Sequence, residues 1–565
     1  MTQTRTFLLL GLLMVAYLLW TGWQQQFDVQ HPVQPAAPAT SSALIAAPAG
    51  DVNAPAPSAK PLATSPNAVS VPPVINSRGH RITVHTDLLD VTIDSAGGTL
   101  VQARLLHYAV RPQQAERVAL LDDHDNHYLV AQSGLIGAGS AVPAADADYA
   151  SAKSSYSLAA GQKHLTVDLT WNDALAGISV TKRYVFTRGS YTVELQQIVR
   201  NTGTQPWSGS VWTQLVRIAP PPPKSHFGFL HDPSSFVFAG GAWYSPGDKF
   251  NKLDYSDFSK KPLARAVSGG WLAFVQHYFV AAWIPPSQQS YRFSSNVVER
   301  QGIPYYALRA VGPTFSVAPK AAAEQTIRLF VGPKRPSVME AAAPGLDLSV
   351  DYGIFTVIAQ PLHWILIQLH RVTLNWGLAI ILLVLLLKAA FFKLSDKQYR
   401  SMARMRKLAP RLKALQERYA DDKTKMQQAV MELYQKEKVN PLSGCWPMLV
   451  QIPVFFALYW VLIESVELRQ APFFGWIHNL SAPDPYFVLP ALNAAVMLLQ
   501  QHLTPAAGMD PTQAKIMKFM PVVMAVFFAF FPAGLVLYYL VNSLTGVLQQ
   551  WWVMRQVERP GATKT

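Results

Sequence analysis

Long apolar runs in the last third of the chain constrain the fold more than any other feature. The first, residues 375–394, reads NWGLAIILLVLLLKAAFFKL. A run of about 20 apolar residues is the length that an α-helix needs to cross the hydrocarbon core of a bilayer. Further apolar runs lie at 446–464, 486–500, 519–531 and 535–552, and one precedes them at 7–23. The sequence therefore predicts a polytopic α-helical membrane bundle of about six spans.

A different pattern, an alternation of apolar and polar residues, runs through the middle of the chain. In KRYVFTRGSYTVELQQIVRN (182–201), Tyr184 and Phe186 share a face of one arm, and Val193 and Leu195 share a face of the other. Gly189 occupies the turn between the arms, as expected for a β-hairpin. Similar runs continue for some 250 residues, so we expect one large all-β sandwich.

The distribution of positive charge predicts the orientation of the helices. The chain carries a net charge of +14, and Lys and Arg gather in residues 397–438, which the positive-inside rule assigns to the cytoplasm. Both termini are then cytoplasmic, and the β domain lies on the other side of the membrane. Residues 354–372 contain Gln360, Pro361 and His363, so we expect an interfacial amphipathic helix here rather than a span.

These features divide the chain into eight segments. The only cysteine, Cys445, excludes an intramolecular disulfide and a multi-cysteine metal site, so the β domain must be stabilised by its own core. The predicted segments are an N-terminal anchor (1–24), a Pro/Ala-rich disordered linker (25–78), the β-sandwich (79–345), the interfacial helix (354–372), the second span (375–394), a cytoplasmic helical hairpin (395–444), the third to sixth spans (446–553) and a short cytoplasmic tail (554–565).

Two interpretations of the cytoplasmic hairpin are open. Apolar residues at helical spacing, such as Met405, Leu408 and Leu412, predict a first helix, and Asp421 and Asp422 are suited to begin the second. The hairpin is either a solvated loop that orients the chain or a docking surface for a ribosome, a translocon or an emerging polypeptide.

Polar residues within the apolar runs are the candidate site. A lysine at the depth of Lys388 costs about 2.5 to 3.5 kcal/mol on insertion scales, so it should face protein or water. The alternative is that its amine reaches the inner headgroups near Lys393. Other runs also contribute polar groups, which suggests a shared hydrated cavity. The candidate residues are Lys388, Gln451, Asn493, Tyr538, Tyr539 and Asn542.

Several stretches of the chain resemble the YidC/Oxa/Alb family of membrane protein insertases, over nearly the full length. They are NWGLAIILL, KVNPLSGCWPMLVQIPVFFALYW, SVELRQAPFFGWIHNLSAPDP, KIMKFMPVVMAVFFAFFPAGLVLYYLVNSL and, in the β region, GGWLAFVQHYFVAAWIP. The resemblance implies a five-helix core, an N-terminal anchor, a periplasmic β super-sandwich, an inner-membrane location and a cytoplasmic hairpin. It also implies a positively charged hydrophilic groove that is open to cytoplasm and lipid and shut toward the periplasm.

The resemblance further implies how the groove works and where this chain departs from the pattern. Substrates are nascent membrane proteins, and the Sec translocon with its SecD/SecF subunits and the ribosome are expected partners. The family's groove cation is typically arginine, whereas Lys388 occupies the position here, and Val384 stands where a polar residue is often found. The expected apolar path for the substrate consists of Val454, Phe455, Leu458, Val523 and Phe527.

Other classes of function have weaker support in the residues. No G-x-x-x-x-G-K-[ST], G-x-S-x-G or H-E-x-x-H motif occurs, so we expect no nucleotide, metal or other cofactor and no enzymatic activity. A solute transporter would also need polar groups in its helices, but no inverted repeat is evident. A further alternative is that the chain is an envelope protein that binds carbohydrate through its β domain.

Overall fold

The computed structural model describes residues 79–124, 127–137, 139–221, 225–226, 230–231, 237–419, 422–437, 446–503 and 511–558. The chain forms two units, Met1–Val69 and Ser70–Thr565, and every described residue belongs to the second. The predicted N-terminal anchor and linker, Cys445 and residues 559–565 lie outside the described residues.

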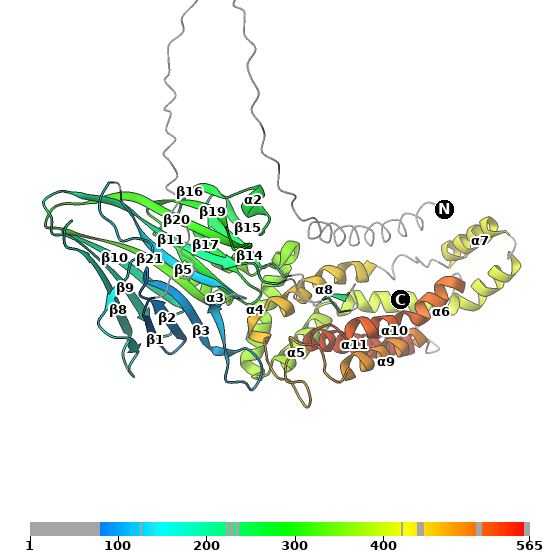
Figure 1. Cartoon of the computed structure of the whole chain (residues 1–565). Coiled ribbons are helices and arrows are strands. Elements are labelled where there is room, and N and C mark those ends of the chain that lie inside the picture. The colour runs from blue at the N-terminus through cyan, green and yellow to red at the C-terminus, as the bar shows by residue number, and fades with distance from the viewer. Residues whose placement is uncertain are drawn as a thin grey trace, which may run out of the picture. The chain divides into compact units, whose positions relative to one another are not determined.

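Two large, mostly antiparallel sheets pack into a sandwich (Figure 1), which confirms the predicted β architecture. The ten-stranded sheet runs, in spatial order, β16 (Ala264–Ser268), β19 (Ser290–Arg300), β20 (Ile303–Val317), β11 (Trp207–Ile218), β5 (Leu129–Gly137), β3 (Thr99–Ala109), β2 (Leu89–Asp94), β1 (Arg81–His85) and β7 (Ser155–Ser157), with β4 (Arg117–Leu121) beside β3. The nine-stranded sheet runs β15 (Lys249–Leu253), β14 (Gly240–Ser245), β17 (Trp271–Val275), β18 (Phe279–Ile284), β21 (Ala322–Pro333), β10 (Thr192–Asn201), β9 (Ile178–Thr187), β8 (His164–Asp173) and β6 (Ala150–Ser151). A separate two-stranded sheet joins β12 (Ser225–His226) and β13 (Leu230–His231).

The predicted hairpin at 182–201 is confirmed. Val193 pairs with Phe186 and Leu195 with Tyr184 across β9 and β10, and all four side chains are buried. Gly189 adopts a positive φ of 73°, which glycine tolerates without strain. The apolar alternation therefore turned one face of these strands toward the opposite sheet, as a period of two requires.

Lys182 is an exception to the apolar core, because it occupies an inward position of β9 and is 1% exposed. Its ammonium group donates to the Gly97 carbonyl (2.6 Å), the Ser133 carbonyl (2.7 Å) and Ser133 Oγ (3.0 Å). Burial lowers the pKa of Lys182 from 10.5 to about 7. The folded protein therefore binds fewer protons than the unfolded chain between these two pH values.

We expect Lys182→Met to remove a pH dependence of stability. In the parent protein the contribution of Lys182 to stability rises between pH 7 and 10.5, by up to about 1.4 kcal/mol per pH unit, because the unfolded state holds the extra proton there. Unfolding of the full chain in detergent, followed by tryptophan fluorescence across this range, measures the effect. The exposed Lys252→Met is the control, and parallel pH profiles for parent and Lys182→Met would contradict the assignment.

Most helices follow the sandwich in sequence, whereas the short α2 lies between β15 and β16. Their bounds are α2 (Asp257–Lys260), α3 (Pro336–Ala342), α4 (Thr356–Thr373), α5 (Trp376–Ala390), α6 (Phe392–Arg418), α7 (Lys423–Lys436), α8 (Trp446–Glu464), α9 (Val488–Leu503), α10 (Pro511–Phe528) and α11 (Ala533–Glu558), with short 3₁₀ turns η2 (Leu346–Ser349), η3 (Gly353–Phe355) and η5 (Val466–Leu468). Helix α11 continues to Glu558, past the point at 554 where the sequence predicted a tail.

No single helix among the described residues is both long and apolar enough to cross a bilayer alone. The pair Trp376–Ala390 and Phe392–Leu415 meets that test together, with a bend of 68° at the break. The predicted single span 375–394 is thus divided at Phe391, between α5 and α6. The number of spans stays a prediction.

Helix α4 has two unlike faces. Ala359, Leu362 and Leu366 are buried, where α4 packs against α5 and α8. Val357 and Trp364 are exposed at 84% and 63%. The exposed apolar face is free to contact lipid, and the interfacial position of this helix stays a prediction.

Helices α6 and α7 pack against each other as a hairpin. Leu408 and Leu412 are buried, and Val430 and Leu433 pack against them. Asp422 begins α7, since its side chain accepts from the backbone N–H groups of Thr424 (3.1 Å) and Lys425 (3.0 Å). This confirms the predicted helix start at Asp422, whereas Asp421 lies outside the described residues.

Candidate functional site

A cavity beside Lys388 brings together polar groups from three helices. Lys388 comes from α5, Gln451 from α8, and Tyr538 and Asn542 from α11. The cavity has a volume of about 30 Å³, which is enough for a water molecule. Its remaining lining residues are Val384, Leu387, Phe391, Leu394, Ser395 and Val454.

Lys388 is not held by a carboxylate among the described residues, since none of the ion pairs found there involves it. Gln451 Nε2 donates to Asn542 Oδ1 at 3.1 Å and so joins α8 to α11 across the cavity. Helix α11 passes close to the lysine at Gly546, where an added Cβ would lie 3.6 Å from Lys388 Nζ. This distance is an ordinary van der Waals contact, so Gly546 marks the place where α11 approaches Lys388.

A second pocket lies beside Lys388, between α5 and α11. It has a volume of about 330 Å³ and is more open than the first. Its lining residues are Leu385, Lys388, Ala389, Phe392, Thr545, Gln549 and Trp552. Tyr538, Asn542, Thr545 and Gln549 follow one another at helical spacing of three or four residues, so one polar stripe of α11 serves both pockets.

Four of the six predicted groove residues meet at the small cavity, namely Lys388, Gln451, Tyr538 and Asn542. Asn493 does not line it: its side chain is buried on α9, with Nδ2 4.0 Å from Met497 Sδ. Tyr539 packs among aromatic rings, with its centroid 4.8 Å from that of Phe455 and 4.5 Å from that of Phe528.

The residues of the predicted apolar path differ in how far they are exposed. Val523 and Phe527 on α10 are exposed at 59% and 42%, whereas Leu458 on α8 is fully buried at 0%. Phe455 is partly buried, and Val454 lines the small cavity itself. Two residues that line the pockets, Ser395 and Gln549, were not predicted from the sequence. Gln549 could have been identified, because it lies two helical turns beyond Asn542 on α11.

A loop between α8 and α9 closes against the start of α11. The Ala533 and Gly534 N–H groups donate to the carbonyls of Ala482 (2.7 Å) and Leu480 (2.8 Å). Asp484, 1% exposed, accepts from Trp476 Nε1 (3.0 Å) and from the N–H groups of Tyr486 (3.1 Å) and Leu489 (2.7 Å). The loop is therefore an ordered cap on one end of the helices.

In the part of the chain that the structure describes, residues of the type that ligate metals do not gather at Lys388. Asp122, Asp123 and His124 lie in the β domain with ligand atoms within 4.8 Å of one another. Asp123 already pairs with Arg81 at 2.6 Å, and hydrogen bonding to Asp122 raises the pKa of the exposed His124. An imidazole that holds its proton more firmly is a poorer ligand, so we assign no metal to this group.

Comparison with known proteins identifies the class. Residues 81–365 match the YidC periplasmic domain, and residues 368–560 match the 60Kd inner membrane protein domain. The membrane protein insertase YidC of Methylococcus capsulatus is 45% identical over 85% of this chain and 86% of that protein. The protein of the same name from Thioalkalivibrio sulfidiphilus is 42% identical over 99% of this chain and 100% of that protein.

A crystal structure titled as active YidC insertase with its first transmembrane domain resolved is 18% identical. It covers 84% of this chain and 93% of that chain at a TM-score of 0.37. The family matches by themselves give a periplasmic domain and an inner membrane protein domain in one polypeptide. The chain belongs to the YidC family of membrane protein insertases.

Proposed function

We propose that the chain moves the polar flank of a nascent membrane protein across part of the bilayer through the cavity at Lys388. The observation that carries this proposal is the meeting of Lys388, Gln451, Tyr538 and Asn542, from three helices, around one cavity. Polar groups within apolar helices are costly unless they contact water or other protein groups. Because these four side chains meet at one cavity, we assign them one common function, contact with the polar flank of the substrate.

Charge complementarity selects the substrate. A polar flank with a carboxylate is attracted to the ammonium group of Lys388, and this attraction is stronger away from bulk water. The cation lowers the desolvation cost of the flank, while partition of the following apolar segment into lipid supplies the driving force. No nucleotide is needed for such a process.

The cavity must widen to admit a polypeptide. A volume of about 30 Å³ holds water but not an amino-acid side chain with its backbone. We propose that α8 moves away from α5 and α11 when the flank enters, with separation of Gln451 from Asn542. The apolar segment then passes along the exposed residues of α10, Val523 and Phe527, and the partly buried Phe455 of α8.

We also propose the topology and the partners. Helices α5, α8, α9, α10 and α11 form the multi-pass core in the inner membrane, with both termini cytoplasmic and the β domain periplasmic. The α6–α7 hairpin carries exposed basic residues, among them Lys407, Arg411 and Lys413, which suit docking of a ribosome. The Sec translocon with its SecD/SecF subunits is a further proposed partner, and no enzymatic step is required.

Charge changes at Lys388 test the proposal. We expect Lys388→Glu to slow insertion of a substrate with an acidic N-terminal flank by roughly tenfold or more. The reason is that the substitution replaces a cation, which attracts the flank, by a carboxylate, which repels it. Lys388→Arg should retain most activity, and Lys388→Ala should be intermediate. Insertion into proteoliposomes, scored by protease protection, is the measurement.

Two controls separate charge from structure. Lys393→Glu makes the same charge change at a residue that lines neither pocket, and it should have little effect. A substrate with a neutral flank should respond weakly to all Lys388 variants. Unchanged insertion of the acidic substrate by all three variants would remove Lys388 from the mechanism.

A further inference from the structure

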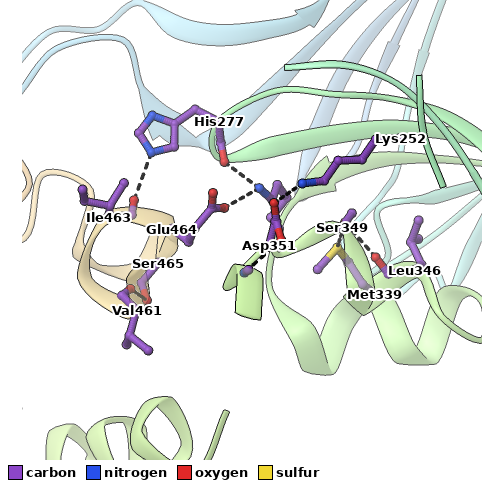
Figure 2. Close-up of polar contacts among 12 residues, drawn as sticks. Lys252, His277, Met339, Leu346, Ser349, Asp351, Val461, Ile463, Glu464 and Ser465 are labelled. Atoms are coloured by element: carbon purple, nitrogen blue, oxygen red, sulfur yellow. Dashed lines mark hydrogen bonds and ion pairs between the residues drawn. The ribbon is translucent and has the colours of Figure 1, made fainter. Parts of the chain in front are cut away.

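A buried ion pair connects the β domain to the end of α8. Lys334, directly after β21, donates from Nζ to Glu464 Oε2 at 2.6 Å, and both side chains are 1% exposed. The same ammonium group donates to the His277 carbonyl at 3.0 Å. Figure 2 shows the Glu464 side chain pointing from the last turn of α8 toward the backbone of His277, the residue whose carbonyl shares the Lys334 ammonium group.

His277 makes a second contact with the same helix end. One of its ring nitrogens lies 3.0 Å from the Ile463 carbonyl oxygen (Figure 2). The last carbonyl groups of a helix lack partners within the helix, so a donor from the β domain satisfies one of them. The turn that contains His277 is thus attached to α8 directly through its ring, and indirectly through its backbone carbonyl, which shares the Lys334 ammonium group with Glu464.

The two sides of this contact have rigid supports. Strand β21 lies inside the nine-stranded sheet, paired with β18 on one side and β10 on the other. Helix α4 attaches to the residues just beyond α8, where Glu467 lies 3.9 Å from His363 and 3.7 Å from Arg335. The C-terminal end of α8 is therefore held by the nine-stranded sheet and by helix α4.

The N-terminal half of α8 faces the cavity at Lys388. Gln451 and Val454 line that cavity, and 13 residues of helix separate Gln451 from Glu464, or about 20 Å at 1.5 Å per residue. The internal Pro453 weakens α8 beside Gln451, but the helix from Val454 to Glu464 follows that proline and is stiff. A small rotation at Glu464 therefore displaces Val454, and with it this wall of the cavity, relative to Lys388 and Asn542.

We infer that the Lys334–Glu464 ion pair positions α8 and thereby sets the width of the cavity at Lys388. Lys334 and Glu464 act here as positioning residues, and the link to insertion rests on the proposed function of that cavity. A buried ion pair adds little net stability compared with packed apolar side chains, but it accepts few geometries. It suits a contact whose purpose is to fix an orientation.

The test separates positioning from stability by comparing variants of the full chain in lipid nanodiscs. Lys334→Met leaves the Glu464 carboxylate buried without its cation, whereas Lys334→Met with Glu464→Leu removes both charges and should restore the unfolding temperature. Lys334→Arg keeps the charge. Lys252→Met breaks the exposed Lys252–Asp351 pair in the same region (Figure 2) and is the matched control.

The position of α8 is read by electron–electron spin distances. Labels at Leu386→Cys on α5 and Ile452→Cys on α8, in a Cys445→Ser background, report the spacing across the cavity; both residues are exposed and neither lines it. We expect the double variant to unfold like the parent but to show a broadened distance distribution and a several-fold loss of insertion. Lys334→Arg and Lys252→Met should match the parent in both readouts.

An unchanged distance distribution in the double variant would overturn the inference. If that variant does not fold, Lys334→Met with Glu464→Gln, which also removes both charges but keeps a side chain of the size of Glu464, is measured in its place. A broadened distribution with full insertion would support the positioning role and contradict the proposed function of the cavity.

Discussion

Replacing Asp484 by alanine is expected to lower the stability of the helical part of the chain by roughly 3 kcal/mol or more. The buried carboxylate accepts three hydrogen bonds, from Trp476 Nε1 and from the N–H groups of Tyr486 and Leu489. Each buried donor left without a partner costs about 1–3 kcal/mol. Thermal unfolding in detergent, followed by near-ultraviolet circular dichroism, measures the loss.

Asp422→Ala is the matched control for Asp484→Ala. Asp422 also accepts two backbone N–H groups at the start of a helix, but it lies at the surface, where water replaces the lost acceptor. Its replacement should therefore change the unfolding temperature far less. Equal effects of the two substitutions would show that the loop between α8 and α9 does not depend on the buried carboxylate.

Gly377→Ala is the second substitution with a large expected effect. A Cβ at this position of α5 would overlap the Phe473 ring, and that ring is fixed by a turn in which the Phe473 N–H donates to the Ile477 carbonyl at 2.9 Å. Overpacking of this kind typically costs about 1–3 kcal/mol. We expect roughly 3 kcal/mol here, because an aromatic ring and its loop must both move.

Truncation of the opposing ring tests this explanation. In the double variant Gly377→Ala with Phe473→Leu, the smaller side chain makes room for the methyl group, so the two changes should cost less together than the sum of their separate effects. A double-mutant cycle on unfolding free energies gives the coupling. Strictly additive costs would mean that Phe473 is not what makes glycine necessary at position 377.

The β-sandwich was predictable because its signals are local. Alternation along 182–201 and a glycine in the turn determine which side chains face inward, and the register of β9 with β10 follows from them. The order of strands in the two sheets was not predictable in this way. Pairings such as β11 with β20 join segments about 100 residues apart, and the pattern of one strand does not identify its neighbour.

The candidate site was predictable in part for a similar reason. Lys388, Gln451, Tyr538 and Asn542 stand out because polar residues are rare in apolar runs, and four of the six predicted residues meet at one cavity. The side of the helix on which Asn493 or Tyr539 lies depends on helix packing, which composition does not determine. The Lys334–Glu464 pair escaped prediction because its partners are 130 residues apart and neither belongs to a motif.

Crosslinking of a nascent chain tests the central claim most directly. A photoreactive amino acid is placed in the acidic flank of a substrate, illuminated during insertion into proteoliposomes, and its adducts are mapped by mass spectrometry. The account predicts adducts on the cavity-lining residues of α5, α8 and α11, and their loss with Lys388→Glu. Adducts confined to other surfaces, and unchanged by Lys388→Glu, would contradict it.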